Sequence, residues 1–346
     1  MAAPLASVET LKAAWKLYRE VGTVTGAAKA AGISCATMQH RIRAARARMD
    51  EIEPKPPASE KHFEAAWQEW LTHIGAAKDR YKGPARARAR GQRTRLVAAG
   101  DFHVPFHDQE AVAALIAKEA KQTDVLLIGG DFGDAYAASV YTKYQSVAFE
   151  YEHAQKTVVL QALSEAFPEI IWLKGSNHSD RYEKRLREHL SRDLLSAVME
   201  MTGGILNPEL ALAKRYPNVT VQCWKTPEGH EVPWLAVYGD VAFSHAEKYS
   251  RVPLAALRAV EEWLDDFSGH LGLPEIKAVM QFHTHTMSLA PWRSDMLLVE
   301  PGAMCLMQDY QLGSKIGGRP QRCGYVSMEF EDGQLDASSV RLHWLK

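Results

Sequence analysis

The sequence lacks any run of about 20 apolar residues, the length that a membrane-spanning helix requires, so we expect no membrane span. Residues 1–20 lack the basic segment and apolar core that mark a secretory signal. Only four cysteines occur in 346 residues, and their spacing matches neither a metal site nor a redox motif: Cys35, Cys223, Cys305 and Cys323. We therefore expect a cytoplasmic protein with reduced thiols.

The chain also has almost no net charge, −1 in total, but this value conceals two oppositely charged parts. Residues 1–95 contain 18 Lys and Arg against 9 Asp and Glu, whereas the rest of the chain has a net charge of −10. A basic part of this kind favours a polyanionic partner. The overall composition, 46% hydrophobic and 24% charged, is that of an ordinary globular protein.

Metal-binding residue types follow five short apolar segments, each with the length and composition of a buried β-strand. The segments are TRLVAAG (94–100), DVLLIGG (124–130), IIWLKGS (170–176), VAFS (241–244) and IKAVMQF (276–282). Longer helical stretches alternate with them, which predicts an α/β sheet. Functional groups gather at the carboxyl ends of such strands. We therefore expect one sheet edge to carry seven candidate ligands: Asp101, His103, Asp131, Asn177, His245, His283 and His285.

The number and type of these side chains indicate more than one metal ion. Four imidazoles, two carboxylates and one amide are too many donors for a single zinc ion. They suit two ions that share a bridging carboxylate, and paired ions about 3.5–4 Å apart fit in-line displacement at phosphorus. The set contains no cysteine, which argues against a purely structural zinc. We expect two divalent ions, with Mn²⁺ favoured and Fe²⁺, Zn²⁺ or Ni²⁺ as alternatives.

Five sequence blocks around these residues resemble, in the same order, those of the calcineurin-like metallophosphoesterase superfamily. GDFHVPFHD is similar to its D-x-H block, GGDFGDAY to GD-x-x-D, KGSNHSDR to G-N-H-E/D, FSHAEK to the lone-His block and FHTH to G-H-x-H. The resemblance covers roughly residues 95–345, and SNHSDRYEKRLREHL looks like phage and prophage members. Three positions depart from the pattern: Ser176 is an extra residue, Ser179 replaces an acid and Phe282 replaces a glycine.

The resemblance implies a four-layer α/β/β/α metallophosphoesterase sandwich and gives each ligand a role. Asp131 would bridge both metals, because a carboxylate can donate one oxygen to each. The other ligands would divide into one site of Asp101, His103 and His285 and a second site of Asn177, His245 and His283.

Three residues near the ligands are candidates for other roles. His178 is the best candidate to stabilise the transition state or to protonate the leaving alcohol. Asp134 would orient His178 or a ligand histidine, and a simple turn residue is the alternative. Arg181 would contact the substrate phosphate from the start of a helix, and a solvated helix face is the alternative.

Residues 1–50 predict a small all-α helix-turn-helix domain. Helical patterns occur in SVETLKAAWKLYREVG (7–22), TVTGAAKAAGIS (23–34) and SCATMQHRIRAARARMD (34–50), with Ser34 as a helix cap. The A-A-x-x-x-G-I-S core resembles that of small DNA-binding domains. In a recognition helix, Gln39, Arg41 and Arg43 would lie near the groove, and Arg46 and Arg48 near phosphates. The alternative is a packing module with solvated arginines.

Residues 51–95 are predicted to connect this domain to a metallophosphoesterase domain of residues 96–346. The proline-rich stretch 50–60 is typical of a linker. The stretch 60–82 predicts an amphipathic helix whose aromatic side chains would dock on the catalytic domain or on a second subunit, so a homodimer is one option. Five arginines between residues 86 and 95 would follow a phosphate backbone or form a solvated connector.

The sequence therefore predicts two-metal hydrolysis of phosphodiester bonds, with nucleic acid, DNA first, as the favoured substrate because of the basic N-terminal part. A phosphomonoesterase or nucleotide phosphatase is one alternative, and a non-catalytic DNA-binding or assembly protein is another. Two further expectations concern single residues. Phe149 should pack the helix predicted at 146–166 onto the sheet, and His107 should lie in a loop or at the surface.

Overall fold

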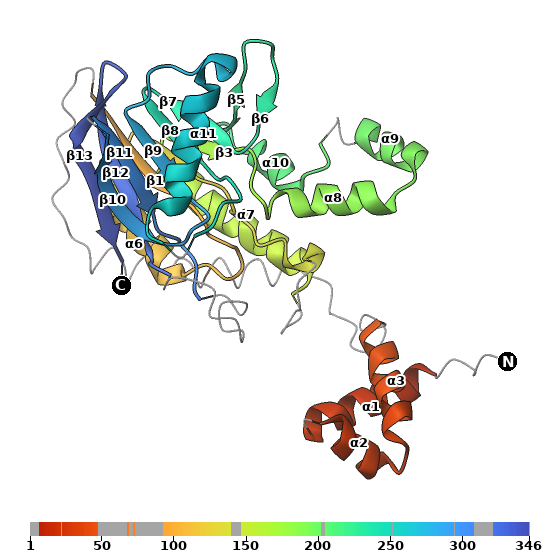
Figure 1. Cartoon of the computed structure of the whole chain (residues 1–346). Coiled ribbons are helices and arrows are strands. Elements are labelled where there is room, and N and C mark those ends of the chain that lie inside the picture. Colours follow the sequence, from red (N-terminus) through yellow and green to blue (C-terminus); the bar gives the residue numbers. More distant parts are fainter. Residues whose placement is uncertain are drawn as a thin grey trace. The chain divides into compact units, whose positions relative to one another are not determined.

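The computed structural model describes residues 7–21, 23–47, 68, 72, 93–139, 147–201, 205–250, 252–293, 295–307 and 321–345. Its contacts divide the chain into two units, Met1–Ser59 and Glu60–Lys346 (Figure 1). The division falls inside the predicted connecting region, most of which lies outside the described residues, the predicted amphipathic helix included. Within the described ranges, no helix is both long and apolar enough to cross a membrane.

The first unit contains three short helices close to the predicted positions: α1 (Val8–Val21), α2 (Val24–Ala31) and α3 (Cys35–Ala47). Polar caps begin all three: Ser7, Thr23 and Ser34 accept hydrogen bonds from the amides of Thr10, Gly26 and Thr37. Gly32 ends α2 with a φ of 65°, which glycine adopts without strain. That this unit is a DNA-binding helix-turn-helix stays a prediction.

The second unit is built on two β-sheets. The first sheet contains, in order, β13 (Gln334–Trp344), β12 (Gly324–Glu331), β1 (Arg93–Ala99), β2 (Val125–Ile128), β3 (Glu169–Leu173) and β4 (Val219–Gln222). The second contains β10 (Met287–Trp292), β11 (Met296–Pro301), β9 (Ala278–Gln281), β8 (Val241–Ser244) and β7 (Leu235–Tyr238), and β5 (Trp224–Lys225) with β6 (Glu231–Val232) forms a separate hairpin. All five predicted strands are confirmed, as β1, β2, β3, β8 and β9.

Parallel pairing gives the strands of the site a common direction. β1, β2, β3 and β4 are parallel in the first sheet, and β8, β9 and β11 are parallel in the second. The strands β7, β10, β12 and β13 run antiparallel to their neighbours. Because the carboxyl ends of parallel strands meet at one edge, each sheet presents its functional loops together.

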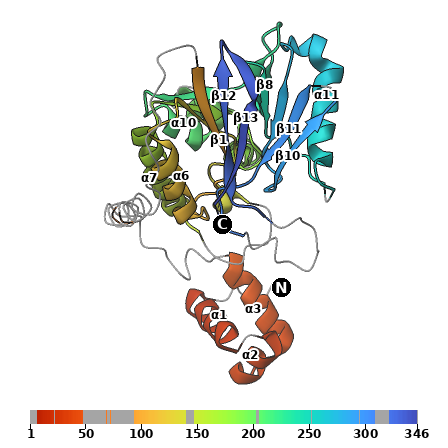
Figure 2. The same cartoon turned by 90° about the vertical axis from the view of Figure 1, so that its left-hand side faces the viewer.

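Helices cover the outer faces of both sheets, as Figure 2 shows. Among the described residues of this unit, the helices are η1 (Tyr136–Ala138), α6 (Gln109–Glu119), α7 (Phe149–Ala166), α8 (Asp180–His189), α9 (Arg192–Met201), α10 (Pro208–Ala213) and α11 (Ala255–Leu271). Leu115 of α6 and Leu163 of α7 pack on the first sheet, and Leu257 of α11 packs on the second. Phe243 and Met280 lie between the sheets. The layers follow the order helix, sheet, sheet, helix, and the predicted mixed α/β class is confirmed.

Arg95, expected in a solvated arginine-rich arm, belongs to β1 instead. Its side chain is only 14% exposed and lies 2.8 Å from Glu119 and 3.8 Å from Glu329. Glu119 is fully buried, so it needs a cationic partner. Arg95 therefore joins the sheet to α6, so neither alternative for the arginine-rich stretch, a phosphate-binding arm or a solvated connector, holds for this residue.

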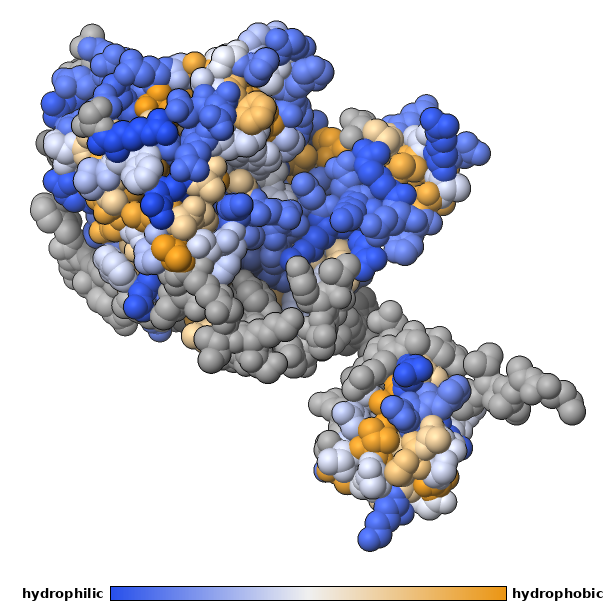
Figure 3. Space-filling view, in the orientation of Figure 1, coloured by the Kyte–Doolittle hydropathy of each residue, from blue (hydrophilic) through white to orange (hydrophobic). Residues whose placement is uncertain are grey.

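Phe149 does not pack α7 onto the sheet, which corrects a second expectation. It is the first residue of α7, is 37% exposed, and lies with its ring 5.1 Å from that of Tyr182 in α8. Residues further along α7, among them Val159 and Leu163, are buried against the sheet in its place. Figure 3 shows hydrophilic side chains over α8 and apolar ones among them at α9.

A buried ion-pair network supports the loop that follows β2. Lys156 Nζ lies 3.0 Å from Glu152 Oε1 and 3.3 Å from Glu209 Oε1, and all three side chains are almost completely buried. Glu152 also accepts hydrogen bonds from the amides of Ala135 and Tyr136. Burial alone would lower the pKa of Lys156, but the two carboxylates outweigh it and raise that pKa. The amine is therefore charged, and it ties α7 to α10 beneath the loop.

Replacing Lys156 by Met should lower the free energy of unfolding by about 3 kcal/mol, because it leaves two buried carboxylates without a cation. Chemical denaturation monitored by circular dichroism would measure the change. The exposed pair of Arg187 and Glu183 provides the control, since Arg187→Met should cost at most about 1 kcal/mol. Equal effects of the two substitutions would contradict the structural role of Lys156.

Candidate metal centre

The seven predicted ligands lie together, and they come from both sheets. Asp101, Asp131 and Asn177 follow β1, β2 and β3 of the first sheet, whereas His245 and His283 follow β8 and β9 of the second. The expectation that a single sheet edge carries them is therefore wrong. The ligands converge because the carboxyl ends of the parallel strands in the two packed sheets meet on the same side of the sandwich.

Asp131 occupies the middle of the cluster. Its Oδ2 atom lies 3.3 Å from His245 Nε2, 3.8 Å from His103 Nε2 and 3.8 Å from His178 Nε2. Its Oδ1 atom accepts a hydrogen bond from the His178 amide at 3.1 Å. The carboxylate is 1% exposed, so water cannot replace these contacts.

Asp101 contacts three of the histidines. Its Oδ1 atom lies 3.1 Å from His245 Nε2 and 3.6 Å from His285 Nε2, and both of its oxygens accept from the His283 amide. In this geometry Asp101 contacts a histidine of each predicted site. The division of the ligands into two separate sites stays a prediction.

The backbone at the ligands is strained. Five of the seven have positive φ angles: Asp101 (52°), His103 (49°), Asp131 (42°), His283 (74°) and His285 (53°). Such conformations cost non-glycine residues about 1–3 kcal/mol each and persist where the surrounding structure enforces them. Here hydrogen bonds from the Asp101 amide to Gly130 and from the His103 amide to Asp131 hold two of the loops. Strain gathered on one cluster of polar side chains is typical of a functional site.

The donor atoms fit a cation. Asp131 Oδ2 and Asn177 Oδ1 are buried and have no hydrogen-bond partner. His103 Nδ1 contacts Asp134 Oδ1 at 2.9 Å, so a neutral His103 presents the lone pair of Nε2. That atom lies only 3.1 Å from His285 Nε2. Asp131, His245 and His283 together can place their donor atoms around one ion, and so can His103, Asp131 and His178.

Without a metal, the cluster holds charged pairs. Burial alone would lower the pKa of His245, but Asp131 and Asp101 outweigh it and raise that pKa to about 10. Burial alone would raise the pKa of Asp131, but His178 and His245 hold it well below its usual range. For His283, burial and the neighbouring His245 lower the pKa to about 4, so its imidazole is neutral and able to bind a metal.

The three other predicted residues lie beside the ligands. His178 Nδ1 contacts the backbone oxygen of Asp134 at 2.8 Å and its carboxylate at 3.1 Å. Arg181 donates to His178 Nε2 at 2.8 Å and to the Asp134 backbone oxygen at 2.9 Å. Asp134 therefore contacts both His103 and His178, as its predicted orienting role requires. The roles themselves stay predictions.

Cys305 also lies in this centre, which its position in the sequence did not indicate. It is 2% exposed, and its sulfur joins His103 and His285 in a group of atoms able to hold an ion. His107, expected in a loop or at the surface, is 3% exposed because its backbone bridges that of Cys305, and burial lowers its pKa to about 4. No spacing rule connects these residues, since β11 lies between His285 and Cys305.

Phe282, the departure from the glycine of the family pattern, fills a space that two glycines leave open. A Cβ atom at Gly129 would lie 2.1 Å from the Phe282 ring, and one at Gly100 would lie 2.5 Å from it. The ring is fully buried between the ends of β1, β2 and β9. The glycines that precede Asp101 and Asp131 therefore accommodate Phe282 without displacing the ligand loops.

Of the predicted nucleic-acid contacts, three have described side chains on α3. Gln39 and Arg43 are exposed, and Arg41 is partly exposed. Arg46 lies within α3 but only its backbone is described, and Arg48 lies outside the described residues. Their contact with DNA stays a prediction.

Comparison with known proteins gives remote likenesses only. No family model and no curated protein matches the chain. Vps29 of Entamoeba histolytica in complex with Zn²⁺ matches with 12% identity over 72% of this chain and 96% of that chain, at a TM-score of 0.34. A predicted phosphoesterase of Streptococcus pneumoniae matches with 11% identity over 74% and 98%, at 0.29. Phosphopantetheinyl hydrolase of Mycobacterium tuberculosis matches with 13% identity over 62% and 90%, at 0.30. Because likenesses of this size define no function, the chemistry is inferred from the centre itself.

Replacing Asp131 by Asn should weaken Mn²⁺ binding by roughly 100-fold or more, since even residues behind the ligands contribute about 10–100-fold. Isothermal titration calorimetry on the metal-free protein would measure this, with two ions bound per wild-type chain. Asp266→Asn, at an exposed position of α11, is the matched control and should bind as wild type does. Unchanged Mn²⁺ binding by the Asp131 variant would contradict the assignment of Asp131 as a metal ligand.

Mn²⁺ affinity should fall as the pH falls from about 8 to 6. With a pKa of about 10, His245 is protonated in the metal-free centre, and an imidazole must lose this proton to bind a metal. Each proton released weakens the apparent affinity about tenfold per pH unit. Titrations in buffers of different ionisation enthalpy would count the protons. Binding without proton release would show that His245 is not a ligand.

Proposed function

We propose that this chain is a two-metal phosphodiesterase of the calcineurin-like metallophosphoesterase superfamily, with nucleic acid as its favoured substrate. One observation carries the proposal. Asp131, a buried carboxylate with one oxygen unpartnered, lies among imidazoles that come from loops of two different sheets. This arrangement suits a pair of divalent ions better than one structural ion, because the donors are too many and too widely distributed for a single tetrahedral site.

The ligands would hold the ions as the resemblance implies, with Asp131 between them. Bound ions of this kind activate a water molecule and neutralise charge on a phosphate group. The chain supplies the remaining groups. Arg181, whose side chain is 15% exposed beside the ligands, offers a guanidinium to a phosphate oxygen. Asp134 fixes the ring of His103 through Nδ1 and leaves Nε2 for the metal.

His178 is placed to move a proton. Burial alone would lower its pKa, but the carboxylates of Asp131 and Asp134 outweigh it and raise that pKa. Its Nε2 atom accepts a hydrogen bond from Arg181 in this structure, so a protonated Nε2 requires Arg181 to turn away. A substrate phosphate would draw Arg181 to itself and free Nε2 for a proton. His178 would then donate this proton to the leaving alcohol.

The preference for nucleic acid rests on the N-terminal part. Residues 1–95 carry the basic charge of the chain, and Gln39 and Arg43 of α3 are exposed. A basic, helical unit of this kind supports binding to a phosphate backbone. The same centre would also hydrolyse a phosphomonoester, so substrate choice needs its own test.

With Mn²⁺ present, wild-type protein should hydrolyse bis-p-nitrophenyl phosphate, and Asp131→Asn should reduce kcat/KM by about 100-fold or more. His178→Ala should have a much smaller effect on this substrate than on a diester with an alkyl leaving group, because p-nitrophenolate leaves without a proton whereas an alcohol needs one. His189→Ala, at an exposed position at the end of α8, is the matched control and should retain activity. Release of p-nitrophenolate measures the rate. Hydrolysis of monoesters alone would make the protein a phosphatase, and absence of hydrolysis with metal bound would favour a binding or assembly protein.

Measurements of DNA binding test whether nucleic acid is the substrate. Arg41→Ala with Arg43→Ala should weaken DNA binding and relax its sequence preference, because these residues are predicted to lie near the groove. Lys16→Ala, at a largely exposed position of α1, is the control for basic charge in the same unit. Equal loss in both proteins would indicate non-specific attraction only.

A further inference from the structure

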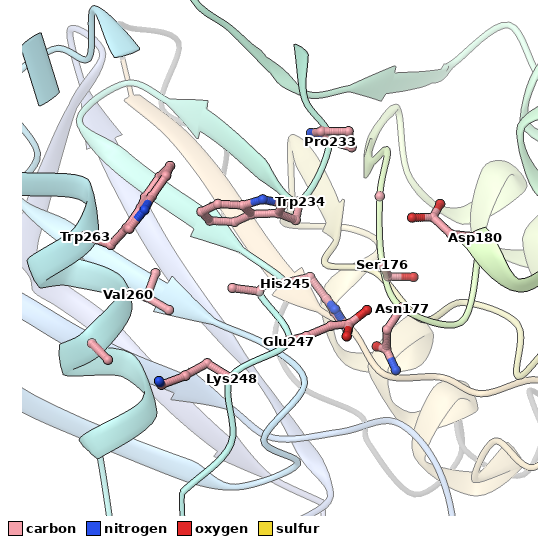
Figure 4. Close-up of a pocket in the computed structure, with 13 residues that line it drawn as sticks. Ser176, Asn177, Asp180, Pro233, Trp234, His245, Glu247, Lys248, Val260 and Trp263 are labelled. Atoms are coloured by element: carbon pink, nitrogen blue, oxygen red, sulfur yellow. The ribbon is translucent and has the colours of Figure 1, made fainter. Parts of the chain in front are cut away.

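A cavity of about 520 Å³ opens directly beside the candidate metal centre (Figure 4). Asn177 and His245, two of the predicted ligands, form its inner end. A group bonded to a phosphate held at these ligands would therefore extend into the cavity. Its volume is in the range of small-molecule sites, about 300–1,000 Å³, and is too small for a nucleic acid duplex.

Aromatic side chains form the far wall. Trp234, just before β7, and Trp263 of α11 both face the cavity, with ring centroids 5.0 Å apart and planes inclined at 59°. Val260 of α11 and Pro233 extend this apolar surface. The face of a tryptophan ring binds planar aromatic groups by stacking, and this stacking tolerates any base because every base has a flat face.

The wall is tied to the ligands by backbone hydrogen bonds. The His245 amide donates to the backbone oxygen of Trp234 at 2.8 Å, and the Gly175 amide donates to that of Pro233 at 2.8 Å. Gly175 itself lies two residues before Asn177. A Cβ atom at Gly175 would lie 2.6 Å from Pro233, so only glycine permits this approach. The aromatic wall and the ligand loops consequently keep a fixed spacing.

Two carboxylates and one amine line the cavity, and the carboxylates on the side of the predicted ligands disfavour a second anionic group there. Asp180 and Glu247 lie on the side of the ligands, and Figure 4 shows the Glu247 carboxylate directed toward Asn177, with Lys248 extending away from it. Burial and the neighbouring carboxylates, Glu183 first, raise the pKa of Asp180, which reflects a negative local field. A neutral group fits this surrounding, whereas a further phosphate does not.

We propose that this cavity binds a single unpaired nucleoside, the base against Trp234 and Trp263, while its phosphate lies at the metal ligands. The inference rests on the proposed function and narrows its substrate to a nucleotide ester. The nucleotide comes either from a free ester or from an unpaired residue of a single strand. Both sources present the same neutral aromatic base and sugar next to one phosphate.

Two diesters with the same leaving group test the proposal: the p-nitrophenyl ester of thymidine 5′-monophosphate and methyl p-nitrophenyl phosphate. Wild-type protein with Mn²⁺ should prefer the thymidine ester by at least tenfold in kcat/KM. Trp234→Ala should reduce this preference about tenfold, within the range expected for loss of one stacked base. Trp344→Ala, which changes a largely exposed tryptophan of β13, is the matched control and should keep the preference.

A second variant guards against a folding defect of Trp234→Ala. Ala259 lies in α11 and lines the same cavity, so Ala259→Trp fills the space without removing a contact. It should reduce the preference for the thymidine ester as much as Trp234→Ala does. Retention of the preference by both folded variants would overturn the proposal.

Binding without turnover separates this inference from the proposed function. Thymidine 5′-monophosphate should quench tryptophan fluorescence of the wild type, and thymidine 3′,5′-bisphosphate should bind at least tenfold more weakly. Equal affinities for the monophosphate and the bisphosphate would contradict the proposal that the cavity rim disfavours a second phosphate. If neither ester is hydrolysed but the monophosphate still quenches, the proposed function fails and the cavity assignment stands. If both esters react equally and nothing quenches, the function stands and the cavity assignment fails. Cleavage of single-stranded but not hairpin DNA would identify the strand as the source.

Discussion

The candidate metal centre depends on one buried carboxylate, Asp131, whose charged partners among the described residues are histidines. Asp131 is removed from water, and one of its oxygens faces three imidazoles without a hydrogen bond. Burying an unpaired charge costs several kcal/mol, so such a group persists only where a cation compensates it. Protonated histidines supply the cation in the metal-free protein, and divalent ions would supply it when bound. The ligand cluster is thus a strained arrangement that a metal would relieve.

The rest of the sandwich provides the rigidity that this arrangement needs. Two sheets packed face to face bring loops from opposite parts of the chain together, and Phe282 fills the space between them beside Gly100 and Gly129. On the outer side, Glu152, paired with Lys156, accepts hydrogen bonds from two backbone amides of the loop after Asp131. Both supports are buried, so the positive φ angles of the ligands are enforced by packing rather than by local preference.

Local pattern in the sequence was sufficient to predict the strands and the polar side chains that follow them, because Asp101, Asp131, His245 and His283 each come at the end of an apolar run. It could not predict contacts made through tertiary structure. Cys305 reaches His285 only because β11 returns the chain to the centre, and Trp234 meets Trp263 only because α11 packs on the second sheet. Arg95 belongs both to the arginine-rich stretch and to the first predicted strand, and its pairing with buried Glu119 of α6 could not be read from either pattern. The exposure of a single side chain, such as that of Phe149, likewise depends on which residues the fold places beside it.

Anomalous diffraction from crystals soaked in Mn²⁺ tests the central claim most directly, because it locates ions without reference to any substrate. Two peaks about 3.5–4 Å apart, with Asp131 between them, are the predicted result. A single peak bound by His103, His285 and Cys305, or no peak at the cluster, would contradict a two-metal centre.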